Sequence, residues 1–175
     1  KEEVDTQKCE ELGVDVVRRI TGGGAVFHDA ELTYSVVCSE QSGVVPKNIL
    51  ESYRKICNAL VLGFARLGLQ ASFVPLNDII VNGKKISGNA QTRREHNVLQ
   101  HGTTLMEVDV DKMFSMLLVP NEKLRGKLIE DVKQRVTSVE KELGEKVSFE
   151  RLAQAMKKGF EENFGVELEP GKLTK

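Results

Sequence analysis

The chain has 175 residues, enough for a single domain with a substantial hydrophobic core. Its 25 Lys and Arg residues nearly balance 26 Asp and Glu residues, so the basic excess typical of nucleic-acid-binding proteins is absent. No apolar run approaches the ~20 residues that a membrane span requires, and the charged start lacks the apolar core of a secretory signal. We therefore expect a cytoplasmic protein that acts neither on nucleic acid nor within a membrane.

The three cysteines give no sign of a disulfide framework or a metal site. Cys9, Cys38 and Cys57 are odd in number, and their spacing fits no zinc pattern. We expect three reduced thiols. Cys38 and Cys57 fall in apolar segments, where cysteine acts as a small hydrophobic residue.

The first third of the chain predicts a short helix and two strands. Residues 2–12 are compatible with a helix that Gly13 would end. The β-branched segment "VDVVRRI" (14–20) predicts a strand, which the glycines 22–24 interrupt. The segment "LTYSVVC" (32–38) predicts a second strand, followed by a loop.

The middle of the chain predicts one long helix and two hairpins. Apolar residues recur every three or four positions over residues 48–67, which predicts an amphipathic helix that Gly68 ends. The Asn-Gly pair between "DIIV" and "KKIS" predicts a two-residue β-turn. A second hairpin is expected at "REHN", joining "ISGNAQTRR" to "VLQHGTTLMEV".

The last third of the chain predicts helices. Residues 110–119, 122–134 and 148–165 have helical patterns, and Ser148 is a suitable N-cap for the last of them. Strands in the first part followed by helices predict an α+β domain with a mainly antiparallel sheet flanked by helices.

The stretch "VVRRITGGGAVFHD" (16–29) combines positive charge with backbone freedom. A glycine triplet alone is compatible with a flexible turn. Beside Arg18 and Arg19, however, glycines allow backbone N–H groups to approach an anion closely. The pattern favours a ligand that carries phosphate or carboxylate, and His28 with Asp29 either forms a turn or closes the ligand loop.

A second group of candidates lies in "NDIIVNGKKISGNAQTRR" (77–94). Asp78 is either a turn residue or a carboxylate for a cation that accompanies a nucleotide. Side chains alternate along a strand, so Lys84 and Lys85 face opposite sides, and spacing does not decide which is functional. The small residues 87–90 would let a ligand lie flat against the sheet. The histidine of "LQHGTTL" is either a structural hydrogen-bonding group or part of the site.

These three motifs together resemble the lipoate–protein ligases of the biotin/lipoate ligase superfamily, from about residue 10 to the end of the chain. The resemblance implies a fold similar to class II aminoacyl-tRNA synthetases and biotin synthetases. It also implies ATP-dependent activation of lipoate to lipoyl-AMP with Mg²⁺, followed by transfer to a protein lysine. The implied acceptors are lipoyl domains of 2-oxoacid dehydrogenase E2 subunits or the H protein of glycine cleavage.

The resemblance also implies the site residues. Lys85, immediately before "ISG", corresponds to the catalytic lysine, and Asp78 corresponds to a residue near the metal–nucleotide. The implied substrate and adenylate contacts are Arg19, Gly22, Gly23, Gly24, Ala25, Val26, Phe27, His28, Asn77, Ser87, Gly88, His101 and Gly102. Residues 1–175 would form one catalytic domain, with a further N-terminal segment and a C-terminal accessory domain, or a separate small subunit, completing the enzyme.

Three other interpretations compete. Octanoyltransferases share many motifs, and "HDAELTYS" resembles one branch of them, but that branch carries its acyl-carrier cysteine in the loop before the first hairpin. Here the loop reads "ASFVPLNDI" without cysteine. Biotin ligases have a lysine-tryptophan-proline lead-in that is missing here. A non-catalytic lipoate-binding subunit is the third alternative, and the presence of Lys85 argues against it.

Overall fold

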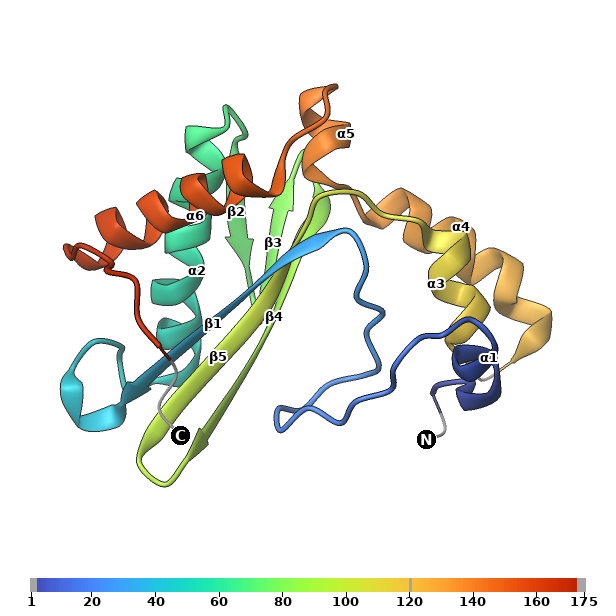
Figure 1. Ribbon diagram of the computed structural model, residues 1–175, viewed down its shortest axis with the longest axis horizontal. Helices are drawn as coiled ribbons and strands as arrows, with labels where there is room; N and C mark the ends of the chain where they lie inside the picture. Colours follow the sequence, from blue (N-terminus) through green and yellow to red (C-terminus); the bar gives the residue numbers. More distant parts are fainter. Residues whose placement is uncertain (1–2, 120, 173–175) are drawn as a thin grey trace.

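The structure is a computed structural model that describes residues 3–119 and 121–172. Its centre is a five-stranded sheet in the order β1-β5-β4-β3-β2 (Figure 1). The strands are β1 (Glu31–Ser39), β2 (Ala71–Val74), β3 (Asp78–Val81), β4 (Lys84–Arg94) and β5 (Asn97–Leu105). All neighbouring strands are antiparallel, which confirms the predicted α+β class.

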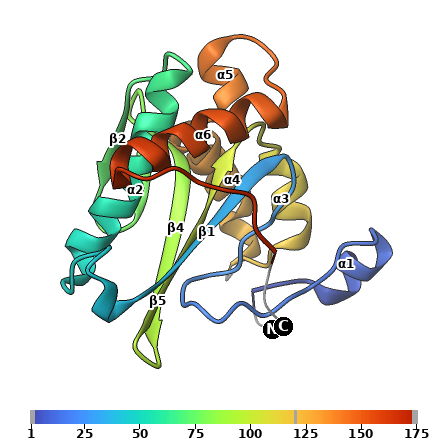
Figure 2. The same ribbon diagram turned by 60° about the vertical axis from the view of Figure 1, so that its left-hand side comes forward.

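Two long helices cover one face of the sheet (Figures 1 and 2). Helix α2 (Ile49–Arg66) begins at the N-cap Asn48, and α6 (Phe149–Phe164) begins at the predicted N-cap Ser148. The side chains of both caps accept a backbone N–H of the first helical turn. The hydrophobic core, including Ile56, Leu60 and Leu152, lies between these helices and the sheet.

The shorter helices gather at one end of the sheet, on the side away from α2 and α6 (Figure 1). They are α1 (Thr6–Glu11), α3 (Val110–Met116) and α4 (Arg125–Arg135), with the 3₁₀ helix η2 (Glu122–Leu124) between α3 and α4. A second 3₁₀ helix, η1 (Glu40–Ser42), lies elsewhere, between β1 and α2. Helix α5 (Val139–Leu143) leads into α6. Among the described residues, no helix is long and apolar enough to cross a membrane.

Alternation along β4 and β5 divides the sheet into two different faces. Ser87, Asn89 and Gln100 point toward the long helices and are buried there. On the other face the β4 residues Gly88 and Ala90 are small, and this face is left open to the loop that precedes β1 (Figure 1). This open face is where the candidate site forms.

Both predicted hairpins are confirmed. Asn82 and Gly83 turn β3 into β4 with positive φ angles of 49° and 76°, the signature of a primed turn. Glu95 and His96 turn β4 into β5, again with positive φ angles of 51° and 62°. The predicted strand over 32–38 and the three later helical segments are present with slightly different ends.

The predicted strand over residues 14–20 is wrong. The segment has no regular structure, and Val17 is 86% exposed. Its β-branched composition favours extended backbone, but no strand of the described residues pairs with it, so no ladder forms. Helix α1 starts only at Thr6, and residue 2 of its predicted range lies outside the described residues. Strand β2 and helix α5 were not predicted.

We expect Gly159 to be essential for packing of α6 on α2. An added Cβ would lie 2.5 Å from the Gly63 nitrogen and 3.0 Å from its Cα, which are backbone atoms that cannot move aside locally. Gly159→Ala should therefore lower the free energy of unfolding by about 1–3 kcal/mol. Gly126→Ala in α4 is the matched control, since nothing lies within 4 Å, and it should be neutral or slightly stabilising. Urea unfolding measures both, and a Gly159→Ala protein as stable as the wild type would contradict this packing.

Candidate functional site

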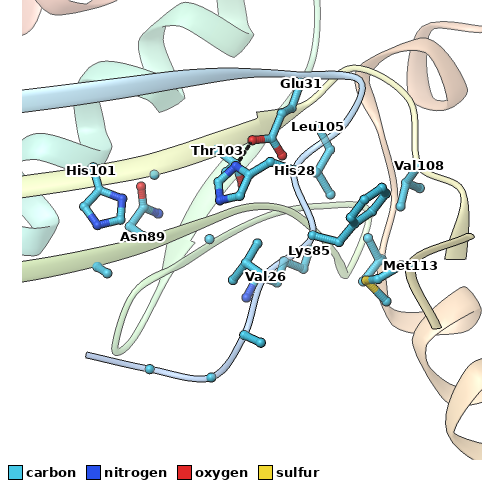
Figure 3. A pocket seen from close by; sticks show the side chains of 18 of the residues that line it. Val26, His28, Glu31, Lys85, Asn89, His101, Thr103, Leu105, Val108 and Met113 are labelled. Atoms are coloured by element: carbon cyan, nitrogen blue, oxygen red, sulfur yellow. Dashed lines mark hydrogen bonds and ion pairs between the residues drawn. The ribbon is translucent and has the colours of Figure 1, made fainter. Parts of the chain in front are cut away.

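A cavity of about 560 Å³ lies against the open face of the sheet (Figure 3). Its floor comes from β4 and β5, one wall comes from the loop before β1, and the far end comes from α3 and α4. This volume falls within the usual range for small-molecule pockets. The walls are chemically different from one another, so the cavity has a polar end and an apolar end.

The glycine-rich loop at the polar end is held together by Arg19. Its guanidinium donates to the Gly22 carbonyl at 2.9 Å and to the Gly24 carbonyl at 2.7 Å. Gly23 has a φ of 105°, which side-chain-bearing residues rarely adopt, and an added Cβ would meet Arg19 Nη2 at 2.8 Å. Arg19 therefore shapes the loop in this structure instead of pointing its charge at the open space.

One N–H group of this loop already receives a carboxylate. The Ala25 backbone N–H donates to Glu3 Oε2 at 2.6 Å. Glu3 belongs to a short N-terminal stretch. The backbone N–H of Leu118 donates to the Glu3 carbonyl at 2.9 Å and fixes this stretch in place. In this contact a backbone N–H of the loop donates to a carboxylate of the same chain. Binding of a ligand anion by the loop stays a prediction.

Side-chain contacts fix both ends of the loop onto the fold. Near its start, buried Thr21 and His101 of β5 form a hydrogen bond of 2.6 Å between Oγ1 and Nε2. Near its end, Lys112 of α3 pairs with Asp29 at 2.7 Å and lies 5.6 Å from the centre of the Phe27 ring. The loop is thereby held over the cavity as one wall.

Lys85 lies across the cavity from this loop and forms an ion pair with Asp78. The distance from Lys85 Nζ to Asp78 Oδ1 is 2.7 Å. A register shift between Ile79 and Ile80 brings these two neighbouring strands into this arrangement. Gly88 leaves room for the lysine, because a Cβ there would lie 3.0 Å from Nζ. Of the two candidate lysines, Lys85 lines the cavity and Lys84 does not.

Asn89 fixes the position of the strand that carries Asp78. Its Nδ2 donates to the Asn77 carbonyl at 2.8 Å, and the Asn77 side chain donates back to the Asn89 carbonyl at 2.5 Å. The Asn89 Oδ1 accepts from the Tyr34 hydroxyl at 2.6 Å, which in turn accepts from Gln100 at 2.8 Å. These buried bonds link β1, β5 and β4 to the start of β3 directly behind the cavity.

His28 and Glu31 form a hydrogen-bonded pair above the cavity, between His28 Nδ1 and Glu31 Oε1 (Figure 3). This bond to Glu31 raises the pKa of His28 above its ordinary value of 6.5, against an opposing effect of burial. His101 behaves oppositely, because burial and then the nearby charge of Arg19 lower its pKa. Two histidines in one cavity are thus tuned in opposite directions.

The far end of the cavity is apolar. Its side chains come from the loop, from β5 and the segment after it, and from α3 and α4 with the residue that follows α4. In that order they are Phe27, Leu105, Val108, Met113, Val132 and Val136. Such a lining suits a hydrocarbon chain. The cavity therefore fits an amphipathic ligand, with an anionic or reactive head between the loop and Lys85 and an apolar tail toward α4.

None of the cavity-lining residues is a cysteine. Cys57 is buried in the core, and burial raises the pKa of its thiol to about 12. Burial also raises the pKa of Cys38, which lies on β1, and Cys9 is buried in α1. As predicted, all three are free thiols, and the pKa values of Cys38 and Cys57 are raised, whereas a reactive thiolate has a depressed pKa.

Most of the residues predicted for the site meet at this cavity. Those that line it are Arg19, Gly22, Gly23, Gly24, Ala25, Val26, Phe27, His28, Asn77, Lys85, Gly88, His101 and Gly102. Asp78 does not line the cavity itself but forms an ion pair with Lys85, which does. Ser87 does not, because strand alternation places its side chain on the helix-covered face, where it is fully buried. Within the described residues, no group of three or more His, Cys, Asp or Glu side chains could hold a metal ion by itself.

Several cavity residues were not predicted. Glu31 follows "HD" in the sequence, but only the turn that returns it toward His28 reveals their pairing. Asn89 lies within the predicted small-residue stretch, yet its role depends on Tyr34 of β1 and on Asn77 in the turn before β3. The apolar end comes from α3, α4 and the residue after α4, which are far from the motifs in sequence.

Comparison with known proteins identifies the relatives of this chain. The family described as "Lipoyl protein ligase A/B catalytic domain" matches residues 1–161. Among curated proteins, the octanoyltransferase LipM of Brevibacillus brevis is 35% identical over 98% of this chain and 71% of its own length. The octanoyltransferase LipM of Geobacillus kaustophilus is 36% identical over 99% of this chain and 71% of its own length.

Solved structures of lipoate–protein ligases superpose closely. The bi-partite lipoate protein ligase of Thermoplasma acidophilum has a TM-score of 0.89 and 33% identity, covering 99% of this chain and 67% of its own. A lipoate-protein ligase A bound with ATP has a TM-score of 0.80 and 30% identity, with 99% and 68% covered. A biotin protein ligase of Aquifex aeolicus, at 14% identity and a TM-score of 0.58, shares the fold.

The opposite tuning of the two cavity histidines is testable by NMR titration of the imidazole rings. His28 should titrate above 6.5, because the Glu31 carboxylate stabilises the imidazolium, and His101 should titrate below it. Glu31→Gln should move the His28 titration to lower pH. A wild-type protein in which His101 titrates at higher pH than His28 would disprove this account of the cavity.

Proposed function

Because the chain belongs to the lipoyl protein ligase A/B catalytic domain family, we propose that it joins a lipoyl or octanoyl group to a lysine of an acceptor protein. One observation carries the proposal. Lys85 and the glycine-rich loop face each other across a cavity with an apolar far end, and no cysteine lines that cavity. The acyl chain would occupy the apolar end, and its carboxyl carbon would lie beside Lys85.

The proposed role of Lys85 is electrostatic. Forming or breaking an acyl-adenylate places a carboxyl oxygen and a phosphate close together, and attack on the acyl carbon develops further negative charge. A lysine ammonium presents a compact positive charge to such groups. Asp78, at 2.7 Å from Nζ, would hold this charge in place before the ligand arrives.

The absence of cysteine from the cavity favours a donor that the acceptor lysine attacks directly. A lipoyl- or octanoyl-adenylate is such a donor, since AMP is a good leaving group. The similarity to a lipoate-protein ligase A bound with ATP supports this choice. Under this proposal, ATP and lipoate give lipoyl-AMP and pyrophosphate, and the lysine amine then displaces AMP.

A magnesium ion fits this proposal only as a companion of the nucleotide. Asp78 supplies one carboxylate, and Mg²⁺ in nucleotide sites is commonly held by one or two carboxylates together with substrate phosphates. Asp78 would then be the protein ligand, and the ion would neutralise phosphate charge during adenylation.

The proposed acceptors are lipoyl domains of E2 subunits or the H protein. The Thermoplasma neighbour is described together with its E2 lipoyl domain, and it is described as bi-partite. A separate accessory subunit is therefore a further proposed partner for the activation step.

Octanoyl transfer from a carrier thioester is the second candidate. The curated relatives named octanoyltransferase LipM support it better than they support a ligase. Against a cysteine-borne intermediate, the segment where that branch carries its cysteine reads "ASFVPLNDI" here, forms β2 and a short link to β3, and contains no cysteine.

A donor comparison separates the two candidates. We expect the chain to modify a lipoyl domain from supplied lipoyl-AMP or octanoyl-AMP, with no acyl group on Cys9, Cys38 or Cys57 in intact-protein mass spectra. A variant with all three cysteines changed to alanine should keep this transfer, apart from some loss of stability. Transfer from octanoyl-carrier protein through a thioester on any of these cysteines would establish the second candidate instead. If the lipoyl domain is modified with none of these donors, acyl transfer itself is refuted.

The two adjacent lysines provide a matched pair of variants. Lys85→Ala should slow transfer from lipoyl-AMP by a factor equivalent to about 2–3 kcal/mol, the scale of one preorganised electrostatic contact. Lys84→Ala should have little effect, because that side chain does not line the cavity. Single-turnover rates measure both, and equal losses in the two variants would contradict the assignment.

A further inference from the structure

His28 has the arrangement of a base that is oriented by a carboxylate. Its Nδ1 bonds to Glu31, whose carboxylate also accepts from the Thr33 hydroxyl at 3.0 Å. The Glu31 side chain is only 5% exposed, whereas that of His28 is 51% exposed. The buried carboxylate therefore fixes the ring, and Figure 3 shows the other ring nitrogen turned away from Glu31. No hydrogen bond within the described residues uses that Nε2.

Transfer to a lysine requires such a base. A lysine side chain has an ordinary pKa of about 10.4, so its amine is almost entirely protonated near neutral pH and is not nucleophilic. Its nitrogen must lose two protons in all, one to become a neutral amine and one as the amide forms. A base whose pKa lies near the working pH does this most effectively.

We propose that His28, oriented by Glu31, accepts the proton that the incoming lysine amine loses during acyl transfer. The inference rests on the proposed function. The lysine nitrogen forms a bond to the acyl carbon, and the bond from that carbon to the phosphate oxygen of AMP breaks with its electron pair. The ammonium loses one proton to solvent before the neutral amine attacks, and as the amide forms the nitrogen loses a second proton to His28 Nε2, which passes it to solvent.

The other ionisable groups around the cavity are already engaged. His101 uses its Nε2 in the bond to Thr21, and Lys85 is paired with Asp78. Asp29 is paired with Lys112. Of the two imidazoles that line the cavity, His28 is the one whose ring is oriented by a carboxylate.

The charges that face His28 come from three elements. Glu31 on β1 raises its pKa, Arg19 in the loop acts in the opposite direction, and His101 on β5 is close enough to interact with it. The net shift is upward from 6.5, so the base is stronger than an ordinary histidine. A pH–rate profile should then rise through a His28 titration that lies above the ordinary value.

The test uses single-turnover transfer from supplied lipoyl-AMP to a lipoyl domain across pH 5.5–9.5. His28→Gln should lower the rate near pH 7 by about 10²–10⁴-fold and remove the histidine limb of the profile. Glu31→Gln should move that limb to lower pH. His96→Asn, at the remote β4–β5 turn with its φ of 62°, is the matched control and should behave as wild type.

Hydroxylamine, a nucleophile that needs no base at neutral pH, separates proton transfer from donor binding. It should react with bound lipoyl-AMP equally fast in wild type and His28→Gln. An equal loss with hydroxylamine would show that His28 acts on the donor and would overturn the inference. So would a His28→Gln enzyme with unchanged rate and pH profile. If the wild-type chain transfers no acyl group from any donor tested, the proposed function is refuted instead.

Discussion

The reciprocal bonds between Asn77 and Asn89 are the constraint on which the site depends. Strand β3 is short, and its ladder with β4 ends at Asp78 and Gly88. One residue beyond it, the two asparagines lock the strands through side chain and backbone, with Asn89 N also donating to Asn77 O at 3.0 Å. Asp78 is therefore fixed at the point where a strand would otherwise fray, and Lys85 is fixed with it. Because Asn89 is held in turn by Tyr34 on the far side of the sheet, the polar end of the cavity is tied to the folded core.

Local signals in the sequence predicted the parts of the fold that depend on local rules. The Asn-Gly turn, the Ser148 cap and the helical spacing over 48–67 each specify structure within a few residues, and all three are present. The segment 14–20 could not be predicted in this way. Whether β-branched residues form a strand depends on a distant pairing partner, and no such partner is present among the described residues. Likewise, alternation excludes Ser87 from the cavity, but the sequence alone did not establish which face the ligand would use.

The cavity is compatible with the chemistry of both kinds of relatives. The curated relatives are named octanoyltransferases, whereas the superposed structures are described as lipoate ligases. Both chemistries require an amphipathic acyl pocket and a lysine acceptor, and the family match extends over the residues that line the cavity proposed for the acyl group. They differ in how the acyl group is activated. A thiol carrier must be accessible and ionisable, and Cys57, buried in the core with a pKa of about 12, is neither.

Two of the basic residues that line the cavity are each oriented by a carboxylate from a neighbouring part of the sheet. Asp78 holds Lys85, and Glu31 holds His28. The repeated device suits two different tasks, because a lysine ammonium and an imidazole differ in what they can exchange. The lysine offers a compact charge for phosphate and carboxylate oxygens. The imidazole is the side chain that gains and loses a proton near neutral pH, and its partner only adjusts where it does so. Under the proposed function, the fixed cation would act on the leaving group and the adjustable base on the nucleophile in amide formation from an acyl-adenylate.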